Sequence, residues 1–136
     1  MQLVEQHIIT RADRRFAAID RAAFASKNLY NAANYKLRQC CIFQGVYLSS
    51  PEMHQRMKDH EAYKALPAEV AQQVLRVLDK NWQSFFAALE AWREDPSKFL
   101  GRPRLPRYKD KQTGRNLLVY TLQALRPSAS RPSAAT

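Results

Sequence analysis

Apolar residues recur at steps of three and four over two long stretches of this 136-residue chain, and this spacing is the strongest constraint on its fold. An α-helix has 3.6 residues per turn, so such spacing places the apolar side chains on one helix face. The first stretch carries Phe16, Ile19, Ala23, Tyr30, Ala33, Leu37 and Cys40. The second carries Val70, Val74, Val77, Asn81, Phe85, Ala88 and Trp92, widened by Leu78, Trp82 and Leu89. We expect two long amphipathic helices, each packed against another long element.

Local signals mark where the predicted helices begin and end. Gly45 is a suitable stop for the first helix, because glycine readily adopts the left-handed angles found just past a helix end. The run Ser49-Ser50-Pro51-Glu52 combines a serine cap, an early proline and an acid, which predicts a short helix to about Asp59. Pro67 opens the second long helix, and Asp95-Pro96 ends it, since the residue before proline avoids helical angles. The helical part is predicted to span residues 13–95.

Two segments that flank the helical part, residues 3–9 and 116–124, are rich in apolar and β-branched or aromatic residues. Their composition predicts two short β-strands. Two strands alone are marginally stable and leave exposed edges, so this sheet looks unfinished. The predicted fold class is therefore mainly α: a long-helix bundle flanked by two short strands.

The segments before and after the helical part complete the predicted domain organisation. A first strand segment is predicted at 1–12, a basic proline-rich linker at 96–115 and a second strand segment at 116–125. The tail, residues 126–136, repeats Arg-Pro-Ser and holds no large apolar residue. It cannot bury enough surface to offset the entropy of ordering, so we predict that it is disordered.

The charge of the chain indicates its class of partner. It carries 22 Lys and Arg against 12 Asp and Glu, a formal net charge of +10, which favours an anionic partner. Nucleic acid is favoured over a membrane, because no apolar run approaches the roughly 20 residues that a membrane-spanning helix needs. The first residues lack the apolar core and cleavage site of a signal peptide, so a cytoplasmic location is expected.

The run KFLGRPRLPRYKDK, residues 98–111, concentrates this charge. Its prolines, Pro103 and Pro106, prevent a helix. An extended run of cations and aromatics suits a phosphate backbone, because Lys and Arg neutralise phosphates and aromatic rings stack on bases. The candidate contacts are Phe99, Arg102, Arg104, Arg107, Tyr108, Lys109 and Lys111. Judged alone, the run fits a binding strip and a solvated linker equally well.

A polar group on the first predicted helix is the second candidate. The sequence NLYNAANYKLRQ places Asn28, Asn31, Tyr35 and Arg38 three or four residues apart, so they can share one face, with Asn34 close by. Amides, a phenol and a guanidinium can hydrogen-bond phosphates, ribose hydroxyls or base edges. The same residues can instead bridge helix to helix inside the bundle, and the two interpretations carry equal weight. Asn31, Asn34 and Arg38 are the predicted secondary contacts.

Support for catalysis or metal binding is slight. Cys40 and Cys41 are adjacent, lack a second pair for a four-ligand zinc site and fit buried helix positions. The chain has three glycines and no phosphate-cradling loop, and no nucleophile–base pair stands out. We therefore predict no catalytic, metal or cofactor site and no enzyme activity. The aromatic cluster of Trp82, Phe85 and Phe86 fits core packing better than base stacking.

Three motifs together carry a family resemblance: LYNAANY, the W-x-x-FF pattern that begins at Trp82, and the run DPSKFLGRP-x-LP-x-YK. With them, about residues 1–125 resemble the N-terminal part of TnpB, the accessory transposase of bacterial insertion sequences. Members of that family are RNA-guided DNA endonucleases related to compact type V CRISPR effectors. The resemblance implies a wedge β-barrel that starts with the first strand and contains an inserted helical recognition domain. It also implies contact with a guide RNA and its target duplex, through helices often described as helix-turn-helix.

The chain departs from that family after Leu125. A RuvC-like nuclease with three acidic metal ligands and a four-cysteine zinc ribbon would follow in TnpB, and neither is found here. The resemblance therefore implies a truncated protein that binds RNA or DNA without cleaving it. A helical protein–protein module that modulates a full-length TnpB and a non-functional gene remnant are the alternatives, and an active nuclease is the least favoured.

Overall fold

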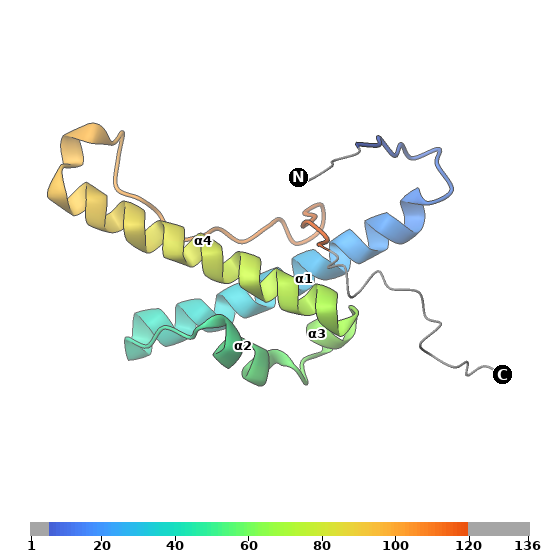
Figure 1. Ribbon diagram of the computed structural model, residues 1–136, viewed down its shortest axis with the longest axis horizontal. Helices are drawn as coiled ribbons and strands as arrows, with labels where there is room; N and C mark the ends of the chain where they lie inside the picture. The colour runs from blue at the N-terminus through green and yellow to red at the C-terminus, as the bar shows by residue number, and fades with distance from the viewer. Residues whose placement is uncertain (1–5, 120–136) are drawn as a thin grey trace, which may run out of the picture.

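Two long helices cross each other, and shorter segments pack around the crossing (Figure 1). The computed structural model describes residues 6–119 of the chain. In chain order its elements are α1 (Phe16–Gln44), α2 (Ser50–Met57), α3 (Glu61–Lys64), α4 (Ala68–Glu94) and the 3₁₀-helix η1 (Pro96–Lys98). Residues 99–119, which we call the strap, then return past α4 to α1 without forming a helix or strand (Figure 1).

The helix ends follow from local chemistry. α1 ends at Gly45, whose positive φ of 67° is left-handed and costs glycine no steric penalty. α2 begins with a capping box, in which Ser49 and Glu52 satisfy each other's backbone N–H groups. The predicted start of the first helix near residue 13 is early, because the Asp13 side chain accepts the N–H of Arg15 (2.8 Å) and forms a turn ahead of the helix.

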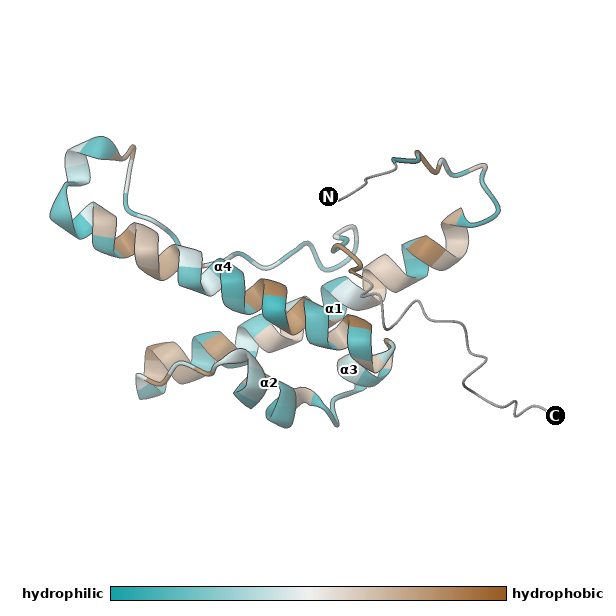
Figure 2. Ribbon diagram, viewed as in Figure 1, coloured by the Kyte–Doolittle hydropathy of each residue, from teal (hydrophilic) through white to brown (hydrophobic). Residues whose placement is uncertain are grey.

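The core lies where α1, α2 and α4 meet. Its most deeply buried side chains are Leu29, Ala33, Leu37, Met53, Val70, Ala71, Leu78 and Trp82. Rings of Tyr47, Phe85 and Phe86 pack with Trp82, at centroid separations of 5.8 to 6.1 Å. Burial of one leucine-sized side chain contributes about 2 kcal/mol, so the helix crossing is the main source of stability. Figure 2 shows brown, hydrophobic positions along both long helices, whereas the strap beside α4 is mostly teal to white.

The prediction of two flanking β-strands is wrong. No strand forms among residues 6–119, so neither residues 6–9 nor residues 116–119 belong to a sheet, and the wedge barrel implied by the resemblance is not present in this part. Residues 3–5 and 120–125 of those segments, and the tail at 126–136, lie outside the described residues. The physical reason is clear at the strap, where backbone N–H and C=O groups form hydrogen bonds with α1 and not with a second strand. Asn116 N–H donates to Ala23 O (3.2 Å), and Leu117 O accepts from Ser26 Oγ (2.9 Å).

Candidate nucleic-acid interface

The strap is fastened to α1 through its backbone. Asn31, near the middle of α1, donates from Nδ2 to Lys109 O (2.8 Å) and accepts the Lys109 N–H on Oδ1 (2.9 Å). One amide side chain thus makes the pair of hydrogen bonds that a neighbouring β-strand would make. Because both hydrogen bonds are to the backbone of residue 109, they do not use the Lys109 ammonium.

Asn34 joins three parts of the molecule. Its side chain is completely buried; Nδ2 donates to Pro106 O (3.1 Å) and Oδ1 accepts from Trp82 Nε1 (2.9 Å). Arg38 donates from Nη2 to the same Pro106 oxygen, and its guanidinium lies 4.6 Å from the centre of the Tyr108 ring. The Asn34 amide therefore links the strap to both long helices, and Arg38, one turn further along α1, holds the same strap carbonyl.

These contacts give the predicted secondary residues a structural role. Asn31, Asn34 and Arg38 are brought together on one face of α1, but their polar groups bind the strap. The alternative of helix-to-helix bridging fits only Asn34, which joins α1 to Trp82 on α4, whereas Asn31 and Arg38 bind the strap. Asn28 and Tyr35, which the spacing grouped with them, are instead exposed.

Lys27 is a member of the same face that the sequence reading missed. Its side chain is only 1% exposed beneath the strap, and Nζ donates to Lys111 O and lies 3.7 Å from the centre of the Phe24 ring. This burial lowers the pKa of the Lys27 ammonium. Steps of four, three and four residues link Lys27 to Asn31, Asn34 and Arg38, so helical spacing counted from Asn31 could have found it.

The far end of the strap is held by an ion pair and a tight turn. Arg115 Nε and Nη2 contact the two carboxylate oxygens of Asp20 on α1, at 2.7 and 3.2 Å. The guanidinium holds the pKa of Asp20 below its usual range. In the turn before it, Asp110 Oδ1 accepts the backbone N–H groups of Gln112 (2.9 Å) and Thr113 (2.8 Å), and these bonds lower the pKa of Asp110.

Most of the predicted contact residues on the strap are exposed. Among the predicted contacts, the side chains exposed on the strap are Arg102, Arg104, Arg107, Tyr108 and Lys111. Lys109 is half-buried, with Nζ 5.1 Å from the centre of the Tyr30 ring, and Phe99 is half-buried as well. The guanidinium of Arg102 lies 5.6 Å from the centre of the Trp92 ring on α4. Such cation–π contacts restrict a basic side chain and leave its charge in place.

A groove of about 450 Å³ runs between the strap and α4. Its lining residues are Tyr30, Asn81, Ser84, Phe85, Ala88, Pro103, Arg104, Pro106, Arg107 and Lys109. In the floor, Asn81 Nδ2 donates to the Tyr30 hydroxyl (2.8 Å). Among these described residues none is acidic, so the groove combines three cations with an amide, a phenol and apolar walls.

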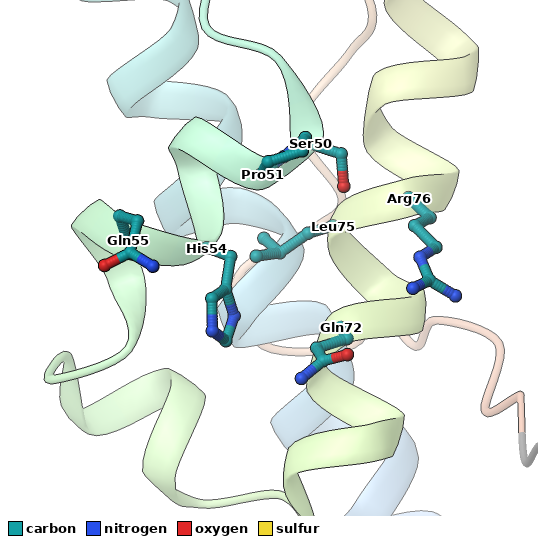
Figure 3. A pocket seen from close by; sticks show the side chains of 7 residues that line it. All are labelled: Ser50, Pro51, His54, Gln55, Gln72, Leu75 and Arg76. Atoms are coloured by element: carbon teal, nitrogen blue, oxygen red, sulfur yellow. The ribbon is translucent and has the colours of Figure 1, made fainter.

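A second hollow, of about 350 Å³, lies between α2 and α4 and is shown in Figure 3. Its polar side chains include His54 and Gln55 from α2 and Gln72 and Arg76 from α4. His54 Nδ1 is already hydrogen-bonded to the Tyr63 hydroxyl (2.9 Å), and the histidine ring stacks edge-on against that tyrosine. With one arginine as its only permanent cation, this hollow is a weaker anion site than the groove beside the strap.

Over residues 6–119, no group of three or more His, Cys, Asp or Glu side chains is placed to hold a metal ion. None of the helices in that range has the length and apolar character needed to cross a membrane. No family model, curated protein or solved structure matches the chain. The resemblance to TnpB therefore stays a prediction from its sequence motifs.

Proposed function

We propose that this protein binds RNA or DNA by laying the phosphate backbone along the strap. The observation that carries the proposal is that the backbone of the strap is held by α1 while several of its cationic side chains are exposed. Its backbone is held by Asn31 and Asn34, whereas Arg102, Arg104 and Arg107 are exposed. A row of cations on a fixed backbone loses less entropy on binding than one on a free linker does.

The geometry of an extended chain suits this role. At about 3.3 Å per residue, Arg102 and Arg104 lie roughly 7 Å apart along the strap, which is about the axial rise of two nucleotides in a duplex. The prolines between the cations keep the segment extended and cannot draw it into a helix. The net charge of +10 adds long-range attraction for a polyanion.

The TnpB-like motifs support the same class of partner, a guide RNA or the DNA it pairs with. Binding without cleavage is the activity proposed for this chain, and the cytoplasm is the proposed location. No cofactor is part of the proposal.

The test is the salt dependence of binding by a triple variant, Arg102→Ala, Arg104→Ala and Arg107→Ala. Each phosphate contact on a single strand contributes about 0.7 to the slope of log K against log salt, so loss of all three should reduce the slope by about 2. Fluorescence anisotropy with labelled single-stranded RNA, single-stranded DNA and duplex DNA gives that slope for each partner.

A matched control removes the same charge elsewhere. Arg56, Lys58 and Lys64 are exposed on or beside α2 and α3, which lie below the crossing in Figure 1, while the strap lies above it. Replacing these three by alanine should change the slope by much less than the strap variant does. Equal slopes in the two triple variants would mean that net charge alone drives binding, and an unchanged slope in the strap variant would remove the strap from the interface.

A further inference from the structure

We propose that the groove between the strap and α4 holds one unpaired nucleotide, so that the protein prefers single-stranded over duplex nucleic acid. This inference rests on the proposed function and names the kind of strand that the site takes. Its evidence is the composition, the rigidity and the size of the groove.

The groove offers a partner for each part of a nucleotide. Arg104, Arg107 and Lys109 line it from the strap and can contact a phosphate. Phe85 and Pro103 supply apolar walls against which a base can stack, and base–aromatic stacking tolerates any base. Asn81, in the floor, brings an amide that can hydrogen-bond the edge of an unpaired base.

The charge of this groove differs from that of a further hollow at the C-terminal end of α4. The hollow lined by Phe86, Leu89 and Arg93 also contains Glu90 and Glu94, whose carboxylates repel an anion. The groove beside the strap has three cations and, among the residues that the structure describes around it, no carboxylate. An anionic ligand therefore has a strong preference for the strap side of α4.

The width of the groove is set by buried hydrogen bonds. Asn34 holds Pro106 of one wall through Nδ2 and Trp82 of α4 through Oδ1. Asn31 fixes the backbone of Lys109 at the inner end of the same wall. The strap backbone that carries the cations and the aromatic wall are thus in place before a ligand arrives, which lowers the entropic cost of binding.

Size and access favour an unpaired nucleotide. A volume of about 450 Å³ lies within the range of small-ligand sites and is much too small for a duplex. The bases of a duplex are stacked and paired inside it, and extruding one costs a few kcal/mol. A single strand presents its bases without that cost, so it can place a base in the groove while its phosphates follow the strap.

The experiment fills the groove without touching the cations. Ser84→Phe adds a ring at an exposed position that lines the groove, and Ala87→Phe adds the same ring at an exposed position three residues away that does not line it. The probes are a labelled 12-nucleotide oligouridine and a labelled 12-base-pair RNA duplex. Ser84→Phe should weaken single-strand affinity relative to duplex affinity by about tenfold, the loss of one stacked base.

Aspartate substitutions at the same two positions test the groove by charge, without adding a large ring that could disturb the packing. Ser84→Asp places a carboxylate among the cations of the groove and should reduce the same ratio, whereas Ala87→Asp should change it by less than about twofold. Circular dichroism melting checks that all four variants fold. If neither Ser84 variant changes the ratio more than its Ala87 partner does, the groove is not the nucleotide site, although strap binding survives. If the unmodified protein binds neither probe, the proposed function itself fails.

Discussion

At the scale of single residues, asparagine does the work that a β-strand would otherwise do. A helix has already used most of its own backbone N–H and C=O groups, so α1 holds the extended strap mainly with side chains. An amide carries a donor and an acceptor side by side, which matches the N–H and C=O of one residue in the strap. Asn31 uses both groups on Lys109, and Asn34 divides them between Pro106 and Trp82.

The first prediction concerns Asn31. Asn31→Ala removes two hydrogen bonds from the half-buried contact with Lys109 and should lower the free energy of unfolding by about 1–2 kcal/mol. Urea denaturation measures this loss, and hydrogen exchange of the Lys109 amide should accelerate at the same time. Asn28→Ala, at an exposed position on the same helix, is the control and should change stability little. Equal effects of the two substitutions would show that helix propensity, and not the strap, accounts for the change.

Sequence reasoning grouped Asn31, Asn34 and Arg38 on α1 but could not choose their role, and it grouped the exposed Asn28 and Tyr35 with them. Helical spacing predicts that Asn31 and Arg38 share a face, and they do. The partner of Asn31 lies 78 residues further along the chain, and no local pattern encodes that contact. Lys27 was missed for the same reason, because a helical lysine is usually solvated and this one is covered only when the strap folds back.

At the scale of elements, the strap depends on one tight turn. Gly114 follows the turn that Asp110 caps, and a Cβ at this position would lie 2.4 Å from Asp110 O and 2.8 Å from Asp110 N. Gly114→Ala should therefore open the turn and weaken the contacts that Arg115 and Asn116 make with α1, at a cost of about 1–3 kcal/mol. Urea denaturation measures the cost, and faster proteolysis near residue 114 should accompany it.

Gly101 provides the control for this prediction. A Cβ there would meet nothing within 4 Å, so Gly101→Ala should leave stability unchanged or raise it by a few tenths of a kcal/mol through the unfolded chain. A loss of stability as large as that of Gly114→Ala would contradict the role assigned to the turn.

The strand prediction failed at this same scale for an instructive reason. Apolar and β-branched residues near 116–119 indicate an extended backbone, and the backbone there does run without a helix. Composition does not say which groups hydrogen-bond to the N–H and C=O groups of that backbone. Here Ser26 Oγ donates to Leu117 O, and Ala23 O accepts the Asn116 N–H, in place of a second strand. The long helices were predictable because their apolar faces repeat locally, whereas the strap was not, because its partners are distant in sequence.

At the scale of the whole molecule, an excess of positive charge opposes folding while it favours binding. The strap brings Arg107 and Lys109 against a helix that already carries Lys27 and Arg38, and among residues 6–119 few carboxylates lie close enough to compensate. Folding therefore gathers like charges, and a polyanion relieves the repulsion. The same charges are used in both processes, so salt should act on them in opposite directions.

The last prediction is that salt stabilises the free protein and weakens its binding. Raising sodium chloride from about 20 mM to about 300 mM shortens the Debye length from about 20 Å to about 6 Å, which screens repulsion across the strap. The melting temperature of the free protein should rise by a few degrees, while its affinity for single-stranded RNA falls. Differential scanning fluorimetry and anisotropy on the same samples measure the two effects.

The Arg102, Arg104 and Arg107 triple variant is the control, and both its melting temperature and its RNA affinity should respond less to salt. A melting temperature that falls with salt would mean that attractive pairs such as Arg115 and Asp20 outweigh the repulsion, and that the strap is held by charge as well as by amides.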